Sequence, residues 1–164
     1  MNNIGFDIVD QLIAEANSPI KTIVAIYPGR FQPMGKHHAE VFKWLQGKFG
    51  TQHTYVATTD KVQLPKSPFN FREKRSIMLK HGIKNIVQVK NPYNPAEILN
   101  KYDPKTTAVV IVYGKKDAGR LRTTKKDGTP GYYQDFSKSK SNLLGYDKHG
   151  YFVISPHISL KVQG

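Results

Sequence analysis

The segment spanning residues 22–45 constrains the fold more than any other stretch, because it joins a buried strand to a helix through a short loop. Residues 22–27 (TIVAIY) are apolar and rich in β-branched side chains, which predicts a strand. After a Pro-Gly break at 28–29, apolar residues recur at helical spacing, as Val41, Phe42 and Leu45. A strand, a tight loop and a helix form half of a βαβ unit, so this segment predicts a parallel α/β sheet.

The loop of this segment is rich in side chains that suit an anion: Arg30, Gln32, Lys36, His37 and His38. In open parallel sheets, ligands bind beyond the carboxyl ends of the strands, where strand turns into helix. The first N–H groups of a helix have no intrahelical partner, so such a turn predicts a phosphate site. Neither G-x-x-x-x-G-K-[ST] nor G-x-G-x-x-G follows the strand, which argues against a P-loop and a dinucleotide-binding turn.

The rest of the chain alternates strand and helix patterns. We expect strands at 53–58, 86–89, 108–113 and 151–154, and helices at 1–19, 71–81 and 96–102. Asn70 and Glu73 have the spacing of a capping box, which places the start of the middle helix at Phe71. The alternation predicts a Rossmann-like, doubly wound parallel sheet with helices on both faces.

Composition narrows the classes of function. A chain of 164 residues suits one domain, 1–164, and the absence of cysteine excludes disulfides and thiolate metal sites. No apolar run is long enough to cross a bilayer, so we expect a soluble, cytoplasmic protein without a membrane partner. The net charge of +13 attracts phosphate-bearing partners, nucleotides and nucleic acids alike. Residues 114–142 are the most basic part and are predicted to form a loop or lid.

The stretch GRFQPMGKHH, residues 29–38, resembles the G-R-F-Q-P-x-H-x-G-H signature of the nucleotidyltransferase superfamily. That superfamily includes cytidylyltransferases and the adenylyltransferases that act on pantetheine phosphate and nicotinamide mononucleotide. Residues 29–33 match letter for letter, and His38 falls on the second histidine. Two positions depart, because Gly35 stands where the family has its first histidine and His37 where it has glycine.

Further blocks extend the resemblance. KSPFNFREKRSIM, residues 66–78, is similar to the basic-x-P-F-x-x-x-E-R-x-x-M stretch of nicotinamide-nucleotide adenylyltransferases, with Lys74 in place of the arginine. YGKKD, residues 113–117, looks like the strand end that contacts base and ribose in the family. The family's I-S-x-T-x-x-R block is represented only by Ile154-Ser155, so either the sequence ends ahead of that block or residues 115–126 take over its role.

The resemblance implies transfer of a nucleotidyl group from ATP or CTP to a phosphorylated small-molecule acceptor, with release of pyrophosphate. Mg²⁺ would accompany the triphosphate, without ligands from protein side chains. The implied catalytic residues are Arg30, Lys36 and His38, and the implied nucleotide-binding residues are Gly29, Arg30, Phe31, Gln32, His38, Gly114, Lys116 and Asp117. Lys66, Arg72 and Arg75 are implied acceptor contacts, with solvated surface charges as an equal alternative. His37 either replaces part of the missing histidine or lies on the surface, and we favour the surface.

Two hypotheses of function follow. The first is a nucleotidyltransferase closest in its motifs to nicotinamide-nucleotide adenylyltransferase. The second is a catalytically weak relative that binds nucleotides or nucleic acid through the same basic loop, which the altered histidine motif and the charge of +13 favour. A homo-oligomer is compatible with both.

Overall fold

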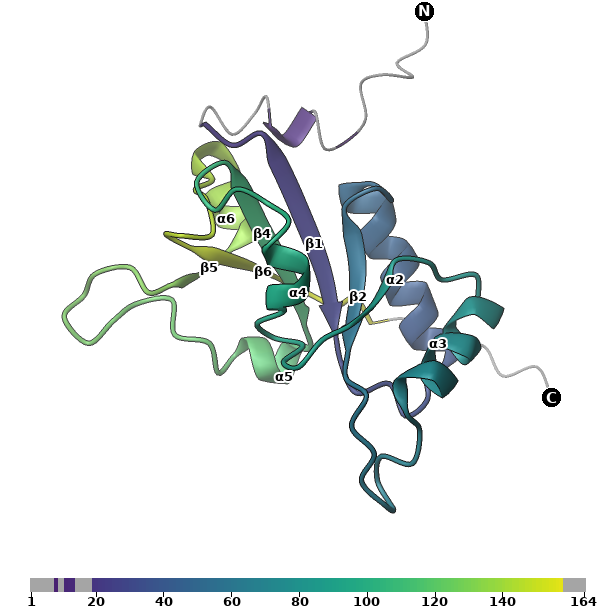
Figure 1. Cartoon of the computed structure of the whole chain (residues 1–164). Helices are drawn as coiled ribbons and strands as arrows, with labels where there is room; N and C mark the ends of the chain where they lie inside the picture. Colours follow the sequence, from purple (N-terminus) through teal and green to yellow (C-terminus); the bar gives the residue numbers. More distant parts are fainter. Residues whose placement is uncertain (1–7, 9–10, 14–18, 158–164) are drawn as a thin grey trace, which may run out of the picture.

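The computed structural model describes residues 8, 11–13 and 19–157. Its centre is a single six-stranded sheet in the order β3-β2-β1-β4-β6-β5, with every neighbouring pair parallel (Figure 1). The strands are β1 (Thr22–Pro28), β2 (Thr54–Thr58), β3 (Ile86–Gln88), β4 (Thr107–Tyr113), β5 (Tyr133–Asp135) and β6 (Gly150–Ile154). Because the chain winds outward from β1 to β3 and then returns to place β4 on the other side of β1, the predicted doubly wound α/β fold is confirmed.

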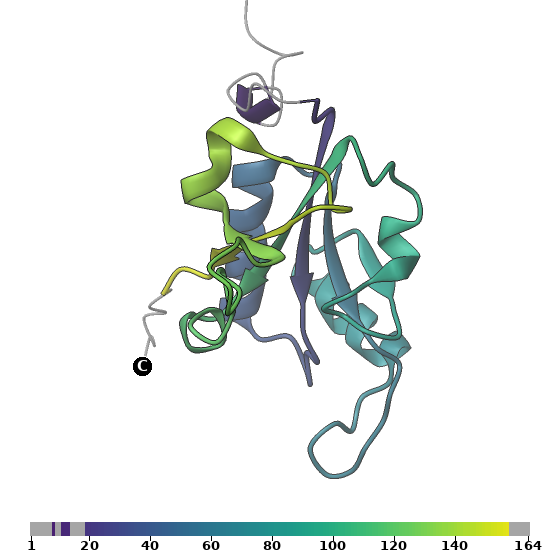
Figure 2. The same cartoon turned by 90° about the vertical axis from the view of Figure 1, so that its left-hand side faces the viewer.

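Helices cover both faces of the sheet, as Figure 2 shows from the side. They are α2 (Lys36–Phe49), α3 (Phe71–Lys80), α4 (Ala96–Leu99), α5 (Lys115–Ala118) and α6 (Phe136–Ser139), with a 3₁₀ turn at Lys140–Asn142. Buried side chains of α2, α3 and α6 belong to one hydrophobic cluster, and those of α4 and α5 belong to a second cluster on the opposite face. No helix in the described ranges is long and apolar enough to span a bilayer.

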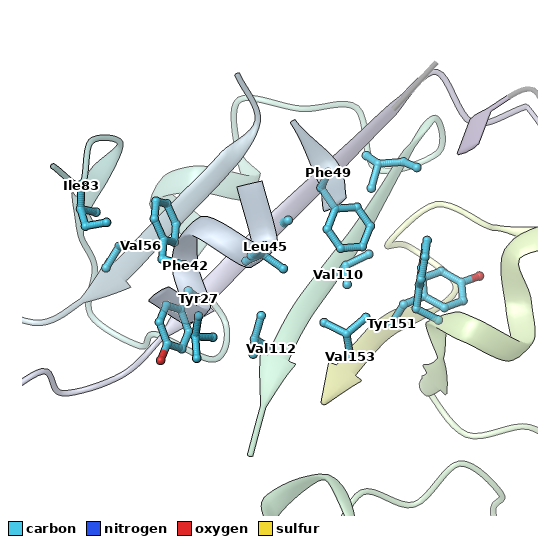
Figure 3. Packing of buried hydrophobic residues seen from close by; sticks show 14 of the residues in the cluster. Tyr27, Phe42, Leu45, Phe49, Val56, Ile83, Val110, Val112, Tyr151 and Val153 are labelled. Carbon is cyan, nitrogen blue, oxygen red and sulfur yellow. The ribbon is translucent and has the colours of Figure 1, made fainter. Parts of the chain in front are cut away.

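The two central strands are buried on both faces, which explains their unbroken apolar runs. Successive side chains of a strand point to opposite faces, so Val110 and Val112 of β4 join the cluster under α2, while Val109 and Ile111 join the other. Figure 3 shows the first cluster, in which Leu45 and Phe49 of α2 lie near Val110 of β4, and Phe42 lies beside Tyr27 and Val56. This packing fixes the direction of α2 and therefore the position of its first turn.

Residues 114–142 have more structure than the predicted loop or lid. They include α5, β5 and α6, and β5 pairs in parallel with β6 at the edge of the sheet. β5 was missed because three residues are too short to show an alternating pattern. Between α5 and β5 the chain extends away from the sheet (Figure 1).

Two other predicted segments differ in extent. The helix expected at 96–102 is limited to Ala96–Leu99. Of the helix predicted at 1–19, residues 8 and 11–13 are helical, and most of the remainder lies outside the described residues. Residues 158–164 are outside them as well.

Candidate functional site

A cavity of about 410 Å³ opens at the carboxyl ends of β1 and β4, the two strands between which the winding of the sheet reverses. In doubly wound sheets this switch point is where ligands bind. The lining residues are Tyr27, Pro28, His37, His38, Val41, Tyr93, Val112, Gly114, Ser155, Pro156 and His157. The cavity therefore brings the start of α2 together with the ends of β4 and β6.

The first turn of α2 leaves backbone N–H groups available beside this cavity. The first intrahelical bond runs from the N–H of Ala39 to the carbonyl oxygen of the N-cap residue Gly35, so the N–H groups of residues 36–38 precede the helical ladder. Gly35 has no side chain to accept from them, and the first turn has no acidic residue. An open helix N-terminus of this kind favours an anion.

His38 has one fixed tautomer in this site. Its Nδ1 accepts a hydrogen bond of 3.0 Å from the N–H of Gly35, so its proton sits on Nε2. Burial, and secondarily the neighbouring charge of His37, lower the pKa of His38 to about 4. Near neutral pH, His38 is therefore an uncharged ring with one N–H donor remaining for a ligand.

The tyrosine hydroxyls of the cavity are hydrogen-bond donors near neutral pH as well. Burial, with a smaller contribution from Tyr93, raises the pKa of Tyr27 to about 12. Burial and the charge of Asp117 raise the pKa of Tyr93. Since both hydroxyls stay protonated at neutral pH, the cavity presents hydrogen-bond donors to a ligand, and none of its described lining residues is anionic.

The loop between β1 and α2 is bent around a buried aromatic ring. Phe31 has φ of 47° and lies beneath the loop, 5.6 Å from the His38 ring and 5.1 Å from the Tyr27 ring between centroids. A Cβ atom at Gly29 would lie 2.9 Å from Cζ of Phe31, so a glycine is required for this packing. Phe31 thus acts through the backbone shape that it imposes, while its ring belongs to the core.

The loop between β1 and α2 is held by contacts to Phe69, which precedes α3, and to Lys74, which lies within α3. The Gln32 amide donates to the carbonyl of Phe69 at 2.9 Å and accepts from the N–H of Phe69 at 2.7 Å. The ammonium group of Lys74 donates to the carbonyl oxygen of Arg30 at 3.1 Å and to Oγ1 of Thr58 at 2.9 Å. The two sequence blocks, 29–38 and 66–78, therefore meet in space.

Sequence reasoning noted Lys74 only as the replacement of a motif arginine and assigned it no role in this site. Its side chain is fully buried, with 0% exposure, and burial lowers its pKa, an effect that the charge of Asp60 partly opposes. The capping box of α3 is confirmed, since Asn70 accepts from the N–H of Glu73 at 2.9 Å and Glu73 from that of Asn70 at 3.1 Å. That helix start predicts a buried face through positions 74 and 78, which is the signal that identifies Lys74.

Two further cavities share Tyr93 with the first. One of about 270 Å³ lies over the β1–α2 loop and is lined by Gly29, Arg30, Gln32, Thr59, Lys61, Gln63, Ser67, Pro92 and Tyr93. The other, of about 340 Å³, lies beside β4 and is lined by Tyr93, Asn94, Pro95, Leu99, Val109, Ile111, Tyr132, Tyr133, Tyr146 and Gly150. Tyr93 therefore lines three cavities: the first, which holds the two histidines, the second, which holds Arg30 and Lys61, and the third, which is rich in tyrosine.

The structure brings some of the predicted site residues together and leaves others apart. His38 and Gly114 line the first cavity, and Gly29, Arg30 and Gln32 line the second. Lys36 is exposed at the start of α2, and Lys116 and Asp117 are exposed on α5, where Asp117 pairs with Arg120 at 3.7 Å. Lys66, Arg72 and Arg75 are exposed as well, and none of these residues lines any of the three cavities.

The described residues contain no group of three or more His, Asp or Glu side chains placed to hold a metal ion. The oxygen atoms that the first cavity offers are hydroxyls and backbone carbonyls. Mg²⁺ commonly keeps several waters and binds through substrate phosphates, so this lining fits an ion that arrives with a triphosphate.

Comparison with known proteins adds no relative: neither a scan against protein-family models nor a search of curated proteins finds a match to this chain.

Proposed function

We propose that the protein is a nucleotidyltransferase, which transfers the NMP group of ATP or CTP to a phosphorylated small-molecule acceptor and releases pyrophosphate. The observation that carries the proposal is the cavity at the switch point between β1 and β4. His37 and His38, from the uncapped first turn of α2, line this cavity, where a phosphate chain would find hydrogen-bond donors and no carboxylate among the described lining residues.

The reaction needs positioning and charge stabilisation more than a protein nucleophile. An oxygen of the acceptor phosphate attacks the α-phosphorus in line, and the bond from that phosphorus to the bridging oxygen breaks, so pyrophosphate leaves with the electron pair. His38 donates a hydrogen bond to the charge that grows on the phosphoryl oxygens, and the N–H groups of the first turn of α2 hold the phosphate chain. Lys36 and Arg30 add positive charge from either side of the loop.

The basic cavity beside Arg30 supports a place for the acceptor phosphate, because Arg30 and Lys61 both line it. Tyr93 lines that cavity as well as the first one, so an acceptor held there would lie next to the triphosphate. The roles of Lys66, Arg72 and Arg75 toward the acceptor and of Gly114, Lys116 and Asp117 toward the nucleotide are part of this proposal. Mg²⁺ bound to the triphosphate would neutralise phosphate charge.

A pyrophosphate-release assay tests the proposal. ATP and CTP are each paired with nicotinamide mononucleotide and with other phosphorylated acceptors, in the presence of Mg²⁺. We expect release with at least one pair and a loss of about a hundredfold in rate for His38→Ala, the usual effect of removing one donor to developing charge. His81→Ala, at the end of α3, is the matched control and should keep the wild-type rate. Absence of release with every pair, or an undiminished rate in His38→Ala, contradicts the proposal.

Nucleic-acid binding is the second candidate, and the surface charge favours it. The net charge of the chain is +13, and its described residues form two ion pairs, Lys43–Glu40 and Arg120–Asp117, so most basic side chains within the described ranges have no acidic partner there. Oligonucleotide affinity that falls steeply with salt, without pyrophosphate release from any substrate pair, would favour this candidate. The exposed Lys125 and Lys126, between α5 and β5, are the side chains to replace in that case.

A further inference from the structure

The rings of His37 and His38 lie close together in the lining of the first cavity. Their ring centroids are 3.8 Å apart, with an angle of 39° between the ring planes, and both side chains line the cavity. His38 is half-buried and His37 is exposed. Side chains of neighbouring residues on a helix point about 100° apart, so the close approach of these two rings needs free space on one side of the helix start.

Gly35 provides that space. A Cβ atom at position 35 would lie 3.3 Å from Nδ1 of His37, which is tighter than most contacts of a real Cβ atom, and 3.5 Å from Cε1, which is ordinary contact. The imidazole of His37 therefore lies against the position of a Cβ atom at residue 35 and would have to move by a few tenths of an ångström to admit one. The backbone of Gly35, with φ of −90° and ψ of 176°, is open to any residue, so the glycine matters here for its missing side chain.

We propose that His37 is a second catalytic histidine of this site, which binds the phosphate chain as a cation through the space that Gly35 leaves open. This inference rests on the proposed nucleotidyl transfer and assigns to His37 the charge that the reaction requires. His38 and His37 then divide two tasks: His38 is a fixed neutral donor and His37 is the ionisable partner.

The charges around the pair support this division. Two imidazoles 3.8 Å apart repel each other when both are protonated, so the pair takes up one proton at a time. Burial and the Gly35 N–H disfavour that proton on His38, and the exposed ring of His37 keeps its contact with water. Among the described residues, the other titratable groups around the pair are Tyr27 of β1, Tyr93 after β3 and His157 after β6 in the cavity lining, with Lys36 and Glu40 on α2.

Binding of a phosphate chain shifts this balance, because a nearby anion favours the protonated imidazole. His37 takes one proton from solvent when the anion binds and keeps it through the reaction. During transfer the acceptor oxygen forms its bond to the α-phosphorus, the bond to the bridging oxygen breaks, and His37 stabilises the leaving pyrophosphate by a charge-assisted hydrogen bond. When pyrophosphate dissociates, the proton returns to solvent.

Calorimetric titration with pyrophosphate and Mg²⁺ at a pH of about 7.5, one unit above the ordinary pKa of histidine, measures this proton in two buffers of different ionisation enthalpy. We expect uptake of a substantial fraction of one proton by the wild type and by the control His81→Asn. His37→Asn should bind pyrophosphate about tenfold more weakly, the size of a lost hydrogen bond to a charged group, and take up no proton. Uptake and affinity unchanged in His37→Asn would overturn the inference.

The same titration separates this inference from the proposed function. Proton uptake that depends on His37, without turnover of any substrate pair, supports the anion-binding role of His37 and contradicts the transferase. Turnover with a His37→Asn rate equal to wild type supports the transferase and overturns the role of His37. Gly35→Ala is a second variant, because its methyl group would lie 3.3 Å from Nδ1 of His37 and 3.6 Å from Nδ1 of His38 and would press on the two rings while the backbone remains allowed. It should lower kcat and pyrophosphate affinity several-fold with little change in the free energy of unfolding.

Discussion

The side-chain amide of Gln32 pairs with both backbone groups of Phe69, donating to the carbonyl at 2.9 Å and accepting from the N–H at 2.7 Å. This pair connects the loop after β1 to the segment that leads into α3. Lys74 makes the neighbouring connection, from α3 to the carbonyl of Arg30. The segment around α3 therefore supports the loop that faces the cavities, and its buried residues contribute through that loop.

Replacement of Gln32 by alanine should uncouple the two segments. The N–H and carbonyl of Phe69 would lose their partners in a half-buried setting, so we expect a loss of about 1–3 kcal/mol in the free energy of unfolding. Urea denaturation measures it, with the exposed Gln52→Ala as a control that should change stability by less than about 0.5 kcal/mol. Equal stability of the two variants would show that the Phe69 contacts contribute nothing.

Lys74 predicts a pH dependence of stability that a lysine on the surface would not give. Its pKa in the folded protein lies below the ordinary 10.5, so the unfolded chain binds more protons between those two pKa values. Stability contributed by this group therefore rises with pH through that window and is lower below it. Urea titrations of wild type and Lys74→Met, from about pH 7 up to the ordinary lysine pKa, measure the free energy of unfolding of each protein. The value for wild type minus that for Lys74→Met should increase with pH.

Lys74→Arg provides the comparison for that experiment. A guanidinium stays protonated across the whole range and is larger than the site that Lys74 fills, so this variant should be destabilised at every pH without the rise. A constant difference between wild type and Lys74→Met over the same pH range would contradict the lowered pKa.

Most of the sheet could be predicted because its strands are long and buried. The predictions at 22–27 and 108–113 lie within one residue of the observed β1 and β4, since both faces of each strand are apolar. Short elements were not predictable in the same way: β5 and α6 have three and four residues and depend on contacts with β6. Local pattern cannot identify an element whose stability comes from a neighbour distant in sequence.

The site was predictable where it depends on local geometry. The turn from β1 into α2 and the position of His38 at the end of the buried face follow from helical spacing, and the structure has both. The close approach of the His37 and His38 rings depends on side-chain conformation, and the burial of Lys74 depends on packing between β2 and α3. Sequence spacing therefore favoured a surface position for His37, which is exposed, and gave no sign that its ring also lines the cavity.

Gly29 and Gly47 form a matched pair for testing the shape of the loop. A methyl group at Gly29 would lie 2.9 Å from Cζ of the buried Phe31 ring, so Gly29→Ala should cost about 1–3 kcal/mol of stability. Gly47 lies inside α2, and a Cβ atom there would meet nothing within 4 Å, so Gly47→Ala should stabilise by up to about 1 kcal/mol. Thermal denaturation compares them, and a shift of the same sign in both variants would contradict the packing of Phe31 beneath the loop.

The protonation of His38 gives a test that needs no substrate. A pKa of about 4, against the ordinary 6.5, means that the folded protein binds fewer protons than the unfolded chain between those values. The stability that His38 contributes is therefore complete above pH 6.5 and is lost as pH falls toward 4, which His38→Gln should not show. Nitrogen-15 NMR of the imidazole should report the Nε2–H tautomer near neutral pH and a midpoint near pH 4. A midpoint near the ordinary value, or a proton on Nδ1, would mean that the Gly35 N–H does not hold the ring, and the cavity would then lack its fixed donor.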